Sequence, residues 1–144
     1  RTGRGHERLA LKAALDTSVL VRFLVGDEAA QAAAAARLLR SAAADSVALF
    51  VPITVALETK WVLRYRYGYE RGQVAHALSD PLSATELAFE AESAPELALP
   101  LYDEGWADFS DCLHVSLAVR AGEQPLWTFD KAAAKLPDAQ LLPA

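Results

Sequence analysis

The sequence of 144 residues contains no methionine, one cysteine and three histidines. The single cysteine, Cys112, can form neither an internal disulfide nor a cysteine-based zinc site. We expect it to be a small buried apolar residue in a reducing, cytoplasmic protein. The histidines, His6, His76 and His114, are scattered without the spacing of metal ligands. These shortages argue against a disulfide scaffold and against a zinc finger.

Long apolar runs are also missing, since no stretch approaches the roughly 18 residues that a membrane-spanning helix needs. No secretory signal peptide is recognisable, and no membrane attachment is expected. Basic residues are outnumbered: 14 Lys and Arg against 19 Asp and Glu give a formal net charge of −5. Proteins that bind nucleic acid are usually basic. The charge therefore argues against nucleic acid unless a metal ion neutralises acids gathered in one pocket.

The composition is that of one soluble globular domain, with 53% hydrophobic and 23% charged residues. Residues 1–8 mix arginine with glycine and show no apolar period. We interpret them as a tag remnant or a flexible extension, and residues 9–144 as a single domain.

Strand patterns alternate with helix patterns along residues 9–144. Short strands are expected at 9–15, 47–51, 86–89 and 126–129, with a last edge strand at 141–142. Helices are expected at 28–44, 53–65, 73–78, from residue 95 onward, and at 108–121. Pro100 leaves the bounds of the fourth helix open, because proline kinks or ends a helix. The alternation predicts an α/β fold with a mostly parallel sheet and helices on both faces.

Four carboxylates stand where a site would form in such a sheet. Asp16 follows the first strand and Asp130 the fourth, and sites in open parallel sheets form outside the carboxyl ends of the strands. Glu58 and Asp111 lie in otherwise apolar helical stretches, where a carboxylate is costly unless it is paired or metal-bound. Asp108 shares a helix face with Asp111. We expect the four acids to meet, and a hard divalent cation to relieve their repulsion and activate water.

Each acid taken alone has a simpler interpretation. Asp16 and Asp130 could be turn residues, and Asp108 could be a helix N-cap. Glu58 could pair with a nearby basic side chain. The prediction of a site therefore rests on the set of acids and on no single member.

Four segments of the chain, in order, resemble the four motifs of PIN-domain ribonucleases. The likeness is closest to the VapC toxins of bacterial and archaeal VapBC toxin–antitoxin pairs, and it covers residues 11–144. Each segment holds one of the four acids: ALDTSVL at 14–20, TVALETKWVL at 54–63, ADFSDCL at 107–113 and TFD at 128–130. The first motif stands later in the chain than is usual in this family, which agrees with an extra N-terminal stretch.

The resemblance implies a three-layer α/β/α domain with a central, mostly parallel sheet, and an endoribonuclease that depends on Mg²⁺ or Mn²⁺. It also implies a homodimer and inhibition by a VapB-like antitoxin. The residues that match the family's catalytic metal site are Asp16, Glu58, Asp111 and Asp130. Auxiliary positions are matched by Thr17, Asp108 and Thr128.

Arg22, Lys60 and Arg64 are candidates for holding RNA phosphates outside the acid pocket, although a solvated helix face or an antitoxin contact is the favoured interpretation. Two alternatives to a toxin stay open: a housekeeping PIN nuclease in RNA processing, and an inactive PIN domain acting as a protein or RNA interaction module. A phosphatase of the haloacid dehalogenase type would need a second aspartate where Ser18 stands.

Overall fold

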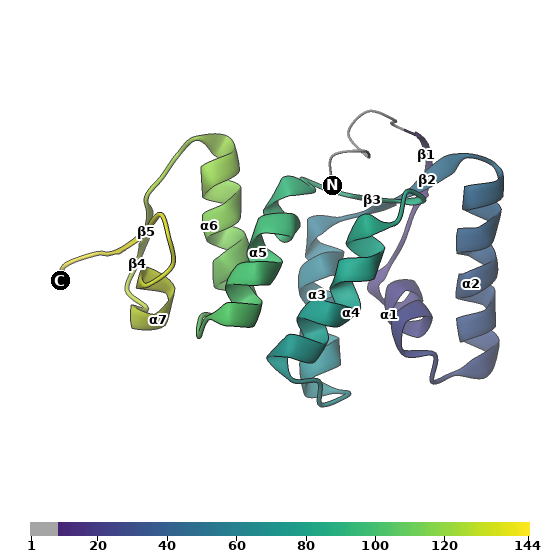
Figure 1. The fold of residues 1–144 in the computed structure, drawn as a ribbon, viewed down its shortest axis with the longest axis horizontal. Helices are drawn as coiled ribbons and strands as arrows, with labels where there is room; N and C mark the ends of the chain where they lie inside the picture. Colours follow the sequence, from purple (N-terminus) through teal and green to yellow (C-terminus); the bar gives the residue numbers. More distant parts are fainter. Residues whose placement is uncertain (1–8) are drawn as a thin grey trace.

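The computed structural model describes residues 9–144 (Figure 1). The interpretation of residues 1–8 as a tag remnant or extension lies outside the described residues. Strands and helices alternate as the sequence predicts, which confirms the α/β class. The strands are β1 (Ala10–Ala14), β2 (Val47–Val51), β3 (Leu87–Phe89), β4 (Leu126–Thr128) and β5 (Ala139–Leu141). The helices are α1 (Thr17–Val25), α2 (Ala29–Ala44), α3 (Ile53–Tyr65), α4 (Arg71–Ser83), α5 (Ser93–Glu104), α6 (Phe109–Ala121) and α7 (Lys131–Ala134).

The strands pair in parallel but form two separate sheets. The first has the order β1-β2-β3, with Ala14 opposite Phe50 and Val51 opposite Phe89. The second consists of β4 and β5. Strands β1 and β4 therefore both lie at a sheet edge, whereas the sequence predicts them in one central sheet.

The middle strand of the first sheet carries the core. Leu49 is 2% exposed and Val51 is fully buried, as expected for an apolar strand that is covered on both faces of a parallel sheet. Strand β1 differs, because all five of its residues are exposed. The three-stranded sheet is thus well covered at β2 and open at β1.

Helices lie on both sides of this sheet. Helix α2 packs against β2 and α1, while α4 packs against β3 and α5. Helices α5 and α6 pack against each other and extend the molecule away from the sheet, so β4, α7 and β5 lie at the end opposite to α2 (Figure 1). None of the helices described is both long and apolar enough to span a membrane.

Two helices continue where the sequence suggested an interruption. Helix α4 runs to Ser83 and includes Pro81, although we expected this helix to end at residue 78. Helix α5 passes through the exposed Pro100. Ala98, Leu99 and Tyr102 of α5 are buried, and this packing outweighs the hydrogen bond that a proline inside a helix removes. The four-residue helix α7 was not predicted.

Candidate active site

Two of the predicted acids, Asp16 after β1 and Glu58 of α3, are linked through Thr17. Asp16 lies two residues beyond β1 and is the N-cap of α1, but its side chain makes no capping hydrogen bond. The neighbouring Thr17 is 7% exposed, and its hydroxyl donates a hydrogen bond of 2.5 Å to Oε1 of Glu58. Thr17 therefore orients Glu58, while the carboxylate of Asp16 stays exposed to solvent.

The other two acids, Asp111 and Asp130, lie near each other. Asp111 is in the first turn of α6, and Asp130 follows β4. Burial raises the pKa of Asp111, and the negative charge of Asp130 raises it further. The Nδ1 atom of His114 lies 3.8 Å from a carboxylate oxygen of Asp111 and partly offsets these effects. A shifted carboxyl group beside a second carboxylate is a common feature of functional sites.

Asp130 also has a structural role. Its carboxylate accepts a hydrogen bond of 2.9 Å from the backbone N–H of Ala133 and so caps α7. Its own backbone N–H donates to the hydroxyl of Thr128 at 3.0 Å. Asp130 is therefore a turn and capping residue, as its simpler interpretation predicts. These hydrogen bonds hold its side chain near the carboxyl end of β4.

An ion pair between a buried lysine and a half-exposed aspartate joins α3 to the start of α6. Lys60 is 3% exposed, and its ammonium group lies 2.8 Å from Oδ1 of Asp108. Asp108 also accepts from the backbone N–H of Phe109 at 2.8 Å, which makes it the N-cap of α6. Burial raises the pKa of Asp108, but the hydrogen bond and the charge of Lys60 outweigh it, so the pKa lies below its usual range.

We expect this pair to make stability depend on acid. Because the folded-state pKa of Asp108 is below its unfolded value, its contribution is present above about pH 4 and is lost as the pH falls through the folded-state pKa. Asp108→Asn should lower the free energy of unfolding at pH 7 by about 1 kcal/mol, since the half-exposed carboxylate is screened by solvent. Urea unfolding of both proteins from pH 7 to pH 3 measures this. An equal difference at every pH would show that the ion pair is not its source.

The two pairs of acids do not meet within the chain. In the part of the chain that the structure describes, no three His, Cys, Asp or Glu side chains are grouped so that they could hold a metal ion. Carboxylate oxygens are ligands of the kind that Mg²⁺ and Mn²⁺ prefer. The donor type therefore fits a divalent cation, but the arrangement in a single chain does not, because Asp16 and Glu58 stand apart from Asp111 and Asp130.

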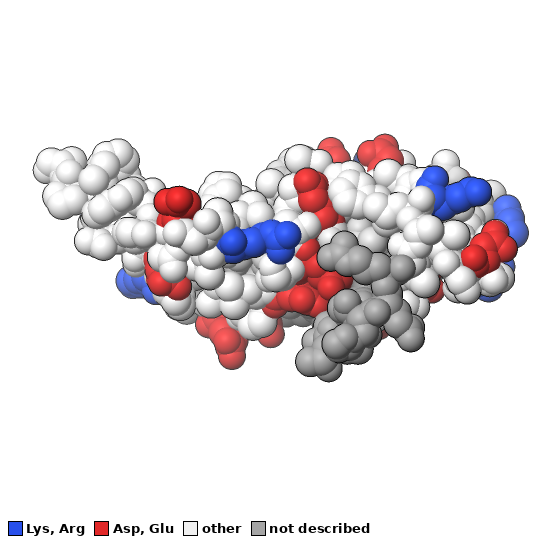
Figure 2. All heavy atoms as spheres, turned by 90° about the horizontal axis from the view of Figure 1, so that it is seen from above, with Lys and Arg blue, Asp and Glu red and all other residues white. Residues whose placement is uncertain are grey.

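The arginines suggested for RNA contact have protein partners. Arg22 donates to Gln31 at 2.8 Å and to the hydroxyl of Tyr67 at 3.1 Å, and Arg64 donates to the carbonyl of Tyr69 at 3.1 Å. On the face shown in Figure 2, acidic and basic side chains form small separate groups and no broad basic surface. RNA binding by these arginines and by Lys60 stays a prediction.

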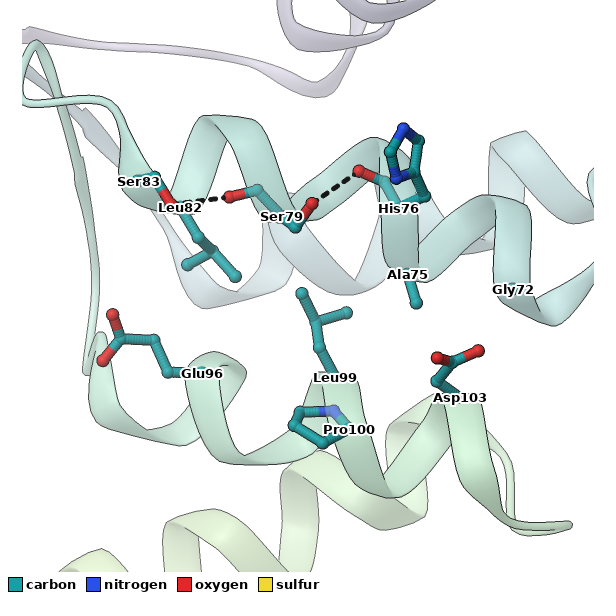
Figure 3. A pocket seen from close by; sticks show the side chains of 10 residues that line it. All are labelled: Gly72, Ala75, His76, Ser79, Leu82, Ser83, Glu96, Leu99, Pro100 and Asp103. Atoms are coloured by element: carbon teal, nitrogen blue, oxygen red, sulfur yellow. Dashed lines mark hydrogen bonds between the residues drawn. The ribbon is translucent and has the colours of Figure 1, made fainter.

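A pocket of about 780 Å³ between α4 and α5 contains none of the predicted acids (Figure 3). Two of its hydroxyls are bound to helix backbone: Ser79 donates to the carbonyl of His76 at 2.7 Å, and Ser83 to that of Ser79 at 3.1 Å. His76, Glu96 and Asp103 also line the pocket, and none of them is among the predicted site residues.

Comparison with known proteins agrees with the four motifs. Residues 13–139 match the family described as the PIN domain, a range that includes all four predicted acids. A VapC ribonuclease of Aquifex aeolicus is 27% identical over 122 residues, which is 85% of this chain and 90% of that relative. No solved structure matches the chain.

Proposed function

The chain belongs to the PIN domain family, and on that premise we propose that it is a metal-dependent endoribonuclease of the VapC type. Its reaction is the hydrolysis of phosphodiester bonds in RNA. The observation that carries the proposal is the set Asp16, Glu58, Asp111 and Asp130, which lies in order within the matched range. Two of these acids follow the carboxyl ends of parallel strands, where sites in α/β folds form.

The proposed cofactor is Mg²⁺ or Mn²⁺. Its support is the chemistry of the donors, since all four are carboxylates and no sulfur or imidazole ligand is in the set. The raised pKa of Asp111 beside Asp130 adds to this support, because a cation would relieve the repulsion that the two carboxylates exert on each other. The auxiliary residues in this proposal are Thr17, Asp108 and Thr128.

The proposed partners are an RNA substrate, a VapB-like antitoxin and a second copy of this chain. The similarity to a VapC ribonuclease over most of both chains supports them. A second candidate function is a PIN domain without nuclease activity that acts as an interaction module. The observation that favours it is the separation of the acids into two pairs.

One assay separates the two functions. The purified protein is incubated with total RNA in EDTA, in Mg²⁺ and in Mn²⁺, and the products are resolved on a gel. The proposed nuclease cleaves RNA only with metal. Cleavage in EDTA contradicts the metal requirement, and intact RNA under all three conditions favours the interaction module.

Metal binding has its own readout in thermal unfolding. A ligand that binds only the folded state stabilises it by about 2.7 kcal/mol at a hundred times its Kd. We therefore expect millimolar Mg²⁺ or Mn²⁺ to raise the Tm of the wild type but not of Asp111→Asn. An equal rise in both proteins would place the metal elsewhere.

A further inference from the structure

Helix α3 presents a single stripe of side chains to solvent. Its exposed residues are Thr54, Glu58, Trp61 and Tyr65. They follow one another at spacings of four, three and four residues, so they share one face of the helix. The stripe therefore contains one of the proposed catalytic acids together with two large aromatic rings.

The two rings are unusual on the outer face of a helix, which normally carries polar side chains. Trp61 is 56% exposed and Tyr65 is 65% exposed. Their ring centres are 5.4 Å apart, and the ring planes are inclined at 45°. The ammonium group of Lys60 lies 5.9 Å from the ring centre of Tyr65, and its ion pair with Asp108 holds it there. Contacts within the chain thus position both rings.

The other aromatic residues of this segment have structural roles. Tyr67 donates a hydrogen bond of 2.7 Å to Asp27, and Tyr69 packs against the hydrophobic core. Trp61 and Tyr65 instead contact each other and leave more than half of their surface to solvent. Exposed aromatic surface that the fold does not use indicates a binding site.

The charges around the rings favour a polyanion as the partner. Residues 59–69 contain three basic residues and no acid, in a chain with a net charge of −5. The charge of Lys60 is offset by Asp108. Arg64, however, donates only to a neutral carbonyl, and Arg66 is exposed. Positive side chains attract phosphates, and aromatic rings among them are a common means of binding single-stranded nucleic acid.

The position beside Glu58 narrows the choice of partner further. Tyr65 stands seven residues beyond Glu58, which is about 10 Å along the helix. The hydrogen bond from Thr17 holds the carboxylate of Glu58 at the start of this stretch. A macromolecule that covers the two rings therefore also lies beside the carboxylate. In an active nuclease, that macromolecule is the substrate.

We infer that Trp61 and Tyr65 form a stacking platform for unpaired bases of the RNA, next to the carboxylate of Glu58. The inference rests on the proposed function and deepens it, because it names two residues that bind the substrate. Bases inside a duplex are stacked on their neighbours and offer no free face, so the platform selects unpaired segments. It does not select a sequence, since every base has a face that can stack.

RNA binding in EDTA tests the platform without cleavage. The probe is a fluorescein-labelled single-stranded RNA of about ten nucleotides, and its Kd is measured by fluorescence anisotropy. Trp61→Ala and Tyr65→Ala should each raise the Kd roughly fivefold to a hundredfold, the usual loss for one stacked base. Trp61→Phe and Tyr65→Phe keep a ring and should restore most of the affinity. The control is Leu38→Ala on α2, a site that is 41% exposed, and it should leave the Kd unchanged.

An abasic version of the same strand separates stacking from phosphate contacts. The wild type and Trp61→Ala should bind this strand with the same Kd, because it has no base to stack. An equally large difference between them on the abasic strand overturns the platform. No binding of the normal RNA by the wild type, or an equal Kd for the wild type and both alanine variants, overturns it as well.

Cleavage kinetics distinguish this inference from the proposed function. Both alanine variants should raise KM and leave kcat nearly unchanged, since they remove binding that is equal in the ground state and the transition state. RNA cleavage with an unaltered KM in both variants overturns the platform but not the nuclease. Binding that depends on the rings, without cleavage in Mg²⁺ or Mn²⁺, leaves the platform standing while the proposed function fails.

Sedimentation of the wild type and Trp61→Ala covers the alternative that the rings contact another protein chain. The platform predicts the same oligomeric state and the same Tm for both proteins, because an exposed side chain contributes little to folding. If the wild type is an oligomer and Trp61→Ala a monomer, the stripe is an interface between copies, and the inference is overturned.

Discussion

Asp111→Asn is expected to lower RNA cleavage by at least about a hundredfold without loss of the fold. Removal of a group that only orients a metal ligand typically lowers metal affinity or activity 10–100-fold. Removal of the proposed ligand itself should lower activity by at least as much. Asparagine keeps the size of the side chain but has no negative charge, so it weakens the hold on a hard cation. The measurement is the initial rate of RNA cleavage in Mg²⁺, with circular dichroism to verify the fold.

The same substitution should not destabilise the metal-free protein. Burial and Asp130 raise the pKa of Asp111, which means that its negative charge is unfavourable in the folded state at neutral pH. A Tm equal to or slightly above that of the wild type is therefore expected. The control is Asp80→Asn on the exposed surface of α4, which should keep full activity. Full activity of Asp111→Asn would refute the catalytic assignment.

Arg71→Ala is expected to lower the free energy of unfolding by about 2–4 kcal/mol, because it leaves two backbone carbonyls without their charged donor. The lost side chain also covers the ring of Tyr102, so packing is lost together with the hydrogen bonds. Urea unfolding measures the change. Through these two carbonyls, Arg71 connects α4 to α5 and to the segment that joins α5 to α6.

A nearby arginine provides the control for this prediction. Arg66 caps the end of α3 with its backbone only and is exposed, so Arg66→Ala should change stability by no more than about 0.5 kcal/mol. A similarly small effect for Arg71→Ala would mean that water replaces the guanidinium at both carbonyls. The hydrogen bonds of Arg71 would then not contribute measurably to the free energy of unfolding.

Local pattern was sufficient to locate most elements. The bounds of β2 and α3 agree with the prediction at both ends, because a short run of Val and Phe and a proline before an amphipathic stretch are both local signals. The four motifs were likewise read from neighbouring residues. Helix α7 is too short for an apolar period, and α4 continues past the predicted end because buried Leu82 and Pro81 pack there.

The sequence by itself determined the fold class, the family and the identity of the acids, because each depends on residues close together in the chain. Only the tertiary structure showed that Lys60 forms an ion pair with Asp108 and that Arg71 donates hydrogen bonds to the carbonyls of Tyr102 and Ala107. It also showed that the four acids do not form one group. These outcomes depend on which distant segments pack together. Strand pairing is such a case, since the edges that β1 and β4 leave unpaired in the described chain have no local signature in the sequence.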